Sequence, residues 1–241
     1  MTSKHADDKF TCMEYSFNEN TPPKEIVAYA MLEISEAMQT EGFKFLKSKS
    51  EIVKRSENFT FRISSQSRKW NEKGVSTEIW LHCSVSDNEE KLWFWGSTLA
   101  FSNGKQGLFH SWELYGKDNY EKSLQEIKTI IFSRLLPFFR RFEQDLQNLI
   151  DEVVENGFCV FEDTQVYDAN YRIPKTFLSK YGTKAQLNIA FQHYIDRHQL
   201  EYVKPNMKKA IELLKEGKQI VNNGEKEYAE FAVKHGLNLV F

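Results

Sequence analysis

Strict alternation of apolar and polar residues is the feature of this chain that most constrains its fold. Phe59, Phe61 and Ile63 alternate with polar residues in FTFRIS, and the same period of two runs through EIWLHCSV at 78–85. A period of two is typical of a β-strand that buries one face and leaves the other open. Both segments therefore predict strands of one sheet, in which residues of one parity point to the core.

Further predicted strands flank these two. FKFLKS and EIVKRS precede them, and KLWFWGSTLAF and GLFHSWELY follow them. These segments are rich in aromatic and β-branched residues, which favour strands. The links between the early segments, such as KSKSE and RSEN, are short and polar, which indicates hairpins. We therefore expect a largely antiparallel sheet.

Segments with the apolar spacing of helices precede and follow the predicted strands in the sequence. Pro22 and Pro23 favour the start of a helix, and Gly42 favours its end. The predicted buried stripe of this helix is Ile26, Ala30, Ile34, Ala37 and Met38. Helices are also predicted at 118–157, with a break or kink at Pro137, and at 174–181, 183–198, 204–216 and 225–235.

These elements predict an α+β protein, with an N-terminal helix and a mainly antiparallel sheet followed by a helical C-terminal part. All five tryptophans lie between positions 70 and 112, so an aromatic β-part is distinct from the helical part. We predict an α+β domain at 1–157 and a helical subdomain at 158–241 that packs on it. The final LNLVF is expected to dock on the body of the protein.

Composition argues against several classes of protein. The formal net charge is −2 over 241 residues, so nucleic acid is not an expected partner. No apolar run approaches the roughly 18 residues of a membrane span, and MTSKHADDKF has no apolar core of a secretory signal. The three cysteines form no CxxC pair, which fits a reducing compartment. We predict a cytoplasmic protein without a membrane partner.

Sequence motifs for catalysis are missing. The histidines form no HExxH pattern, and the glycines form neither GxxxxGK[ST] nor GxGxxG. The Gly–Ser pair of FWGSTLAF lacks the second glycine of a nucleophile elbow. We therefore expect no cofactor and no metal, and we name no catalytic residue. A site assembled from residues distant in sequence stays open, so enzymatic activity is undecided, with a non-catalytic role favoured.

The open face of the predicted sheet is the candidate partner-binding surface. Its candidate residues are Arg62, Trp80 and His82 on the strands, with Arg68 and Trp70 after the first strand. Exposed tryptophan beside arginine is typical of protein-binding hot spots. Two structural alternatives compete: the C-terminal helices cover this face, or the polar segment is a hairpin tip with Trp70 packed back. We favour each of these structural explanations over the binding role of the residues that it concerns. A base-stacking role for Trp70 is less favoured than its packing in the hairpin.

Three features carry a resemblance to a known family. They are the entry Gly42–Phe43–Lys44, the strand Phe59–Phe61–Ile63 that ends in Gln66–Ser67, and Pro137 before an aromatic helix. In these features the first two thirds of the chain resemble the bacterial family called domain of unknown function 4304. The resemblance implies an accessory or immunity-like protein of a bacterial conflict system, and it brings no catalytic residues.

Together these arguments predict a non-catalytic, intracellular bacterial protein that binds another protein. The expected partner is a basic toxin or a subunit of a defence complex, because acidic patches suit a basic partner. The alternative is an enzyme or a nucleic-acid-processing component of a defence system. The oligomeric state stays open.

Overall fold

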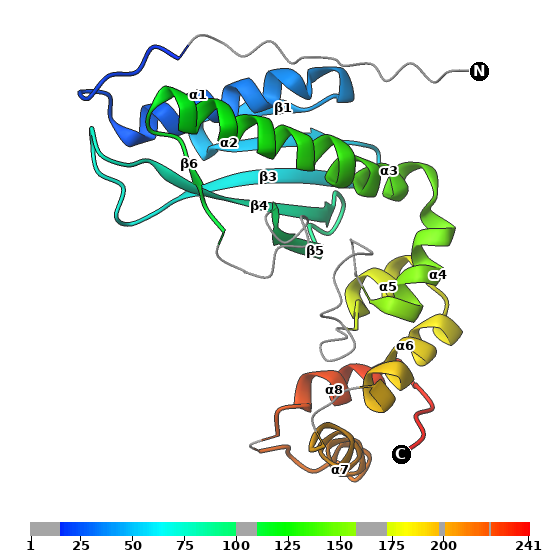
Figure 1. Ribbon diagram of the computed structural model, residues 1–241. Helices are drawn as coiled ribbons and strands as arrows, with labels where there is room; N and C mark the ends of the chain where they lie inside the picture. The colour runs from blue at the N-terminus through cyan, green and yellow to red at the C-terminus, as the bar shows by residue number, and fades with distance from the viewer. Residues whose placement is uncertain (1–14, 100–109, 158–172, 198–200, 222) are drawn as a thin grey trace. The chain divides into compact units, whose positions relative to one another are not determined.

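The computed structural model describes residues 15–99, 110–157, 173–197, 201–221 and 223–241 (Figure 1). The chain divides into two compact units. The first consists of Met1–Lys91 and Gly96–Phe139, and the second of Leu92–Trp95 and Arg140–Phe241. This division falls earlier in the chain than the predicted boundary at 157. The predicted packing of residues 158–241 on the first domain stays a prediction.

A six-stranded sheet contains the segments that the alternation predicted. Its strands are β1 (Lys44–Leu46), β2 (Glu51–Arg55), β3 (Phe59–Ser67), β4 (Glu78–Asp87), β5 (Trp93–Thr98) and β6 (Trp112–Glu113). Their order is β1-β2-β3-β4-β5, and β6 also pairs with β4. The pairs β1–β2, β2–β3, β3–β4 and β4–β6 are all antiparallel, as the short polar links indicated.

The register of β3 against β4 gives the sheet two different faces. Phe61 lies opposite Val85, and the next pair along is Arg62 opposite Ser84. The inner face consists of the buried residues Phe59, Phe61, Ile63, Ile79, Leu81, Cys83 and Val85. The outer face consists of Thr60, Arg62, Ser64, Gln66, Glu78, Trp80, His82, Ser84 and Ser86. The predicted burial of one parity in each strand is confirmed.

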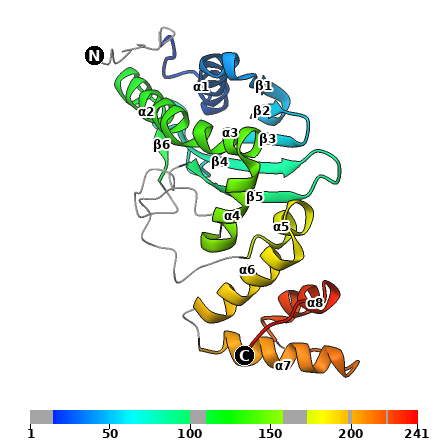
Figure 2. The same ribbon diagram turned by 90° about the vertical axis from the view of Figure 1, so that its right-hand side faces the viewer.

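Two helices, α1 (Pro23–Ala37) and α2 (Lys117–Ile130), lie on one side of the sheet (Figures 1 and 2). α1 contacts β1, β2 and β3, and α2 contacts α1 and β6. The predicted stripe of α1 is buried at Ile26, Ala30, Ile34 and Met38, whereas Ala37 is half-buried. α1 ends at Ala37, before the predicted stop at Gly42. Gly42, with φ +84°, instead ends the following turn η1 (Gln39–Glu41) in a left-handed conformation.

A further helical stretch follows α2 through η4 (Ile131–Leu135) and α3 (Leu136–Gln144) to α4 (Leu146–Asn156). η4 is a π-helical turn, and Pro137 is the second residue of α3. Proline has no N–H to donate within a helix, so an irregular turn beside it is expected. The break itself comes later, at Asp145, whose φ of −145° lies outside the helical region.

In its described residues, the regular structure of the second unit is helical apart from the part of β5 within residues 92–95. Its remaining helices are α5 (Lys175–Tyr181), α6 (Lys184–Arg197), α7 (Val203–Lys215) and α8 (Lys226–Lys234). They match the helices predicted from glycine and proline punctuation.

The C-terminal tail docks on α6 as expected, although through hydrogen bonds. The Val240 N–H donates to Gln192 Oε1 at 3.0 Å, and Gln192 Nε2 donates to the Val240 carbonyl at 2.9 Å. The Val240 side chain is exposed, so the docking of this residue does not depend on burying it. With helices and an antiparallel sheet, and helices in the C-terminal part, the predicted α+β class is confirmed.

Candidate functional site

The β3–β4 ribbon brings together the residues predicted for partner binding. Gln66 lies opposite Trp80, Ser64 opposite His82 and Arg62 opposite Ser84. Because side chains two residues apart on a strand point to the same face, Arg62, Trp80 and His82 share the outer face. All three are half-buried. No described helix of the first unit lies on this face (Figures 1 and 2).

Arg68 joins this face at the end of the ribbon. Its guanidinium lies over the Trp80 ring, 5.3 Å from the ring centroid, and Nη1 is 2.7 Å from Glu78 Oε2. The Ser111 hydroxyl donates to the same Glu78 oxygen at 2.6 Å. A planar guanidinium suits both contacts at once, since it stacks on an aromatic ring and forks to a carboxylate. Arg68 is therefore a neutralised, positioned side chain.

Arg62 has a different environment. Its Nη1 donates to the Ser86 hydroxyl at 2.6 Å. Among the described residues no carboxylate lies within ion-pair distance of it. Its neighbours on the outer face are serine and valine: Ser84 opposite it on β4 and Val53 opposite it on β2. Arg62 is thus half-buried with neutral residues directly opposite it on both neighbouring strands, while Glu51 and Arg55 lie diagonally from it on β2.

His82 and the buried Thr60 are also hydrogen-bonded on the outer side of the ribbon. A ring nitrogen of His82, Nε2, lies 2.9 Å from Gln66 Oε1, and a hydrogen bond there requires the proton on that nitrogen. The Thr60 hydroxyl donates to Asn88 Oδ1 at 2.5 Å. These side chains are held in place by cross-strand contacts, which favours recognition by pre-positioned polar groups.

Trp70 corrects one expectation. We expected it to pack back onto the hairpin, but it is 73% exposed, and Val75 on the same tip is 62% exposed. Among the described residues its ring is contacted by the Lys69 ammonium, 5.5 Å from the Trp70 centroid. Beyond Gln66 the apolar period ends, so no inward-facing neighbours continue the core under this side chain. The prediction that Trp70 lies at the surface is confirmed. The prediction that it packs back onto the hairpin is wrong.

The hairpin tip that carries Trp70 is nevertheless well fixed. The Asn71 side chain donates to the Glu78 carbonyl and accepts from the Glu78 N–H, each at 2.8 Å. Glu72 and Ser76 form a further antiparallel bridge. At Gly74, φ is +75° and an added Cβ would lie 2.9 Å from the Glu19 carbonyl oxygen, so a side chain has no room there. Trp70 and Val75 thus project from an ordered tip.

Val75 and Ser86 are the residues of this surface that sequence reasoning missed. Val75 lies next to Gly74 in a turn-like stretch, where a single apolar residue gives no periodic signal. Ser86 directly follows the predicted segment 78–85, so its place opposite Thr60 could have been inferred by extending the alternation by one residue. Its contact with Arg62 crosses the ribbon diagonally and depends on the rotamer of a long side chain.

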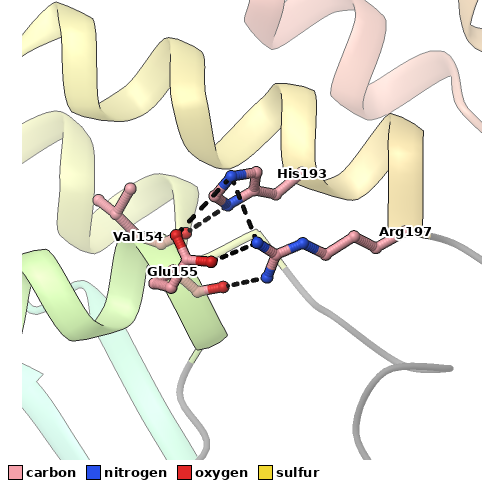
Figure 3. A network of polar contacts seen from close by, with 4 residues as sticks. All are labelled: Val154, Glu155, His193 and Arg197. Carbon is pink, nitrogen blue, oxygen red and sulfur yellow. Dashed lines mark hydrogen bonds and ion pairs between the residues drawn. The ribbon is translucent and has the colours of Figure 1, made fainter.

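A second polar cluster lies in the second unit, between the C-terminal end of α4 and α6 (Figure 3). Arg197 donates to the Glu155 carbonyl at 2.6 Å and also to the Glu155 carboxylate. His193 lies beside both, with Nδ1 3.2 Å from the Val154 carbonyl oxygen and Nε2 3.8 Å from Glu155 Oε2. The hydrogen bond from Arg197 lowers the pKa of the Glu155 carboxyl, with a further contribution from His193.

This cluster holds two helix ends together, and its groups are already engaged with one another. The Glu155 carboxylate accepts a hydrogen bond from the Arg197 guanidinium. The same guanidinium also donates to the Glu155 carbonyl in the last turn of α4. Carbonyl groups at a helix C-terminus have no partner within the helix, so a cationic side chain is favourable there. We therefore assign the cluster a structural role.

A buried ion pair lies in the core of the first unit. Lys128 Nζ of α2 donates to Glu33 Oε1 of α1 at 2.8 Å, and the Tyr120 hydroxyl lies 3.3 Å from Glu33 Oε2. Lys128 and Glu33 are both almost fully buried. Buried charges of opposite sign that are hydrogen-bonded to each other avoid the large cost of an isolated charge. Sequence reasoning missed this pair because its members are 95 residues apart.

Other reactive groups add no site. Burial raises the pKa of the Cys83 thiol well above its ordinary value, so this cysteine stays protonated and unreactive. Cys12 and Cys159 lie outside the described residues. In the described part of the chain, no three histidine, cysteine or acidic side chains are grouped as metal ligands. Over the same residues, no helix has both the length and the apolar character that crossing a membrane requires.

Scans against family models, curated proteins and solved structures find nothing that matches this chain. The resemblance to domain of unknown function 4304 therefore stays a prediction.

Proposed function

We propose that this chain is a non-catalytic protein-binding protein whose contact surface is the outer face of the β3–β4 ribbon together with its tip. The observation that carries the proposal is the exposure of Trp70 on a fixed hairpin. Tryptophan is enriched among residues that dominate binding energy, and it loses little conformational entropy when it is buried by a partner. A rigid hairpin presents it without an ordering cost.

The outer face extends this contact surface from the tip along the ribbon. Trp80 is half-buried beneath the Arg68 guanidinium, and His82 and Arg62 follow on the same face. Interfaces commonly combine aromatic anchors with arginine and a polar rim. Four of the residues predicted from sequence share the outer face, and Trp70 lies on the tip at the end of the same ribbon, which supports the proposal of a single binding surface.

The biological setting of the proposal comes from the family resemblance. An accessory or immunity-type component of a bacterial conflict system would act in the cytoplasm by binding a toxin or a subunit of a defence complex. Such a role needs surface complementarity and no chemistry. Affinity capture of partners from the native host tests this setting.

The experiment is affinity capture from a lysate of the native host, with the wild-type chain and Trp70→Ala immobilised in parallel. A specific partner is expected to be retained by the wild type and lost from Trp70→Ala, because the substitution removes the central apolar anchor. Tyr202→Ala is the matched control, since Tyr202 is an aromatic residue of the second unit that is 54% exposed. That control should retain the partner.

Two results would contradict the proposal. Identical sets of proteins retained by the wild type and Trp70→Ala would remove the tip from the contact surface. Reproducible turnover of nucleotides or nucleic acid by the purified chain with added magnesium, manganese or zinc would replace binding by catalysis, provided that one carboxylate substitution abolished it in a folded protein.

A further inference from the structure

We propose that the outer face around Arg62 binds an acidic segment of the partner protein, so that Asp or Glu carboxylates of the partner contact Arg62. This inference rests on the proposed protein-binding function and specifies the chemistry of the partner. It differs from the basic partner expected from acidic patches, because it follows from the local charge of this surface.

The pairing of arginines in the structure carries the argument. Arg68 is 2.7 Å from a Glu78 carboxylate oxygen, and Arg141 is 2.5 Å from one of Glu152. Arg62 is paired only with the Ser86 hydroxyl among the described residues. A half-buried guanidinium is partly shielded from water and still has donors to satisfy, so a carboxylate is its most favourable further partner.

The surroundings of Arg62 also favour an anion. On β1, β2 and β3 the outer face carries Lys44, Arg55 and Arg62 but only one carboxylate, Glu51. Lys44 and Arg55 are exposed. This local excess of positive charge contrasts with the net charge of −2 of the whole chain. Complementary charge of this kind orients partners and raises their rate of association.

Hydroxyl groups beside Arg62 provide additional donors. Ser84 lies directly opposite it, and Ser64 follows two residues later on the same face. Serine hydroxyls donate to carboxylate oxygens and can rotate to suit the acceptor. Arg62 with these hydroxyls can therefore receive a carboxylate in a forked arrangement with lateral hydrogen bonds.

The test uses short homopolymers as defined probes with the full-length protein. Binding of fluorescent decaglutamate, decalysine and a ten-nucleotide oligothymidylate is measured by anisotropy at low and high salt. Decaglutamate is expected to bind, to weaken with salt, and to lose at least about tenfold in affinity in Arg62→Gln, which removes a charge-assisted contact. Arg62→Lys keeps the charge and loses the forked geometry of the guanidinium. Its affinity for decaglutamate should therefore lie between those of the wild type and Arg62→Gln.

Arg134→Gln is the matched control. Arg134 is also a half-buried arginine of the first unit, but it lies on the helical turn η4 and not on the sheet. The substitution changes net charge equally and should leave decaglutamate binding unchanged. Circular dichroism and thermal unfolding of each variant verify that the fold is retained.

Several results would overturn the inference. These are failure of decaglutamate to bind, equal binding by wild type and folded Arg62→Gln, or decalysine binding as tightly as decaglutamate. Tighter binding of the oligothymidylate that is lost in Arg62→Gln would assign the face to nucleic acid instead. The capture experiment with Trp70→Ala is independent of these probes, so a failure here leaves the protein-binding function itself to be judged separately.

Discussion

The two faces of the β3–β4 ribbon are built from the same strands and yet differ in burial, and the outer face is the one that we propose for binding. Phe61 and Val85 are fully buried on the inner face, while Arg62 and Ser84, the next pair along, are half-buried on the outer face. Helix α1 covers the inner face. Neighbouring residues of one strand therefore differ in how much they contribute to the core, so substitutions on the two faces should differ in kind as well as in size.

The largest loss of stability is expected from Ile34→Asp, on the buried side of the covering helix α1. Ile34 is fully buried in α1, so the substitution places an unpaired charge in the core and should lower the free energy of unfolding by more than about 4 kcal/mol. Leu32→Asp is the control, because Leu32 lies on the same helix and is 38% exposed. Urea denaturation measures both, and an unchanged midpoint for Ile34→Asp would rule out the buried stripe.

Phe61→Ala tests the inner face of the ribbon directly. The substitution leaves a cavity where the Phe61 ring packs 4.9 Å from that of Phe139, and it should cost about 3–4 kcal/mol. Arg62→Ala, one residue further along, should change the free energy of unfolding by only about 0.5 kcal/mol. Equal losses for the two variants in denaturant titrations would remove the distinction between the faces.

Trp70→Ala should have little effect on stability. The side chain is mostly exposed, so its removal is expected to change the free energy of unfolding by less than about 1 kcal/mol. Thermal unfolding followed by circular dichroism measures this on the same protein used for partner capture. A loss of about 3 kcal/mol would instead show that Trp70 packs on the body in solution, and any loss of binding would then reflect unfolding.

The smallest effect concerns the exposed charge cluster of the second unit, which contrasts with the buried pair of Glu33 and Lys128. Because Arg197 lowers the pKa of Glu155 in the folded chain, this carboxylate stabilises the fold above the unfolded pKa, and the contribution is lost as pH falls through the folded one. Since Glu155 is largely exposed, the contribution is small. Carboxyl NMR titration should show the pKa of Glu155 rising in Arg197→Gln, and no change would contradict the assigned contact.

Periodicity explains how much of the fold could be predicted. The alternation runs from Phe59 to Ile63 in β3 and from Glu78 to Val85 in β4, so the buried parity was evident from sequence. The helices α5 to α8 lie between glycine and proline signals and begin and end within one or two residues of their predicted positions. The irregular π-turn η4 before Pro137 was not predicted beyond a break or kink, because its form depends on packing around the helix.

The candidate surface was predictable in part for the same reason. Arg62, Trp80 and His82 share a face because strand parity places them there. Trp70 lies beyond the last alternating residue, and the direction of its side chain depends on how the Asn71 side chain joins the hairpin to Glu78. No local pattern in the sequence encodes that junction.

The sequence by itself determined which side of each strand and helix is buried, because the period of a strand or helix is a local property of the chain. The tertiary structure alone decided which polar side chains meet. It pairs Glu33 with Lys128 across 95 residues, places Arg68 over Trp80, and leaves Arg62 with a serine as its partner among the described residues. Such contacts depend on how distant segments return to one another, and that return is set by the packing of the whole core and not by any local period.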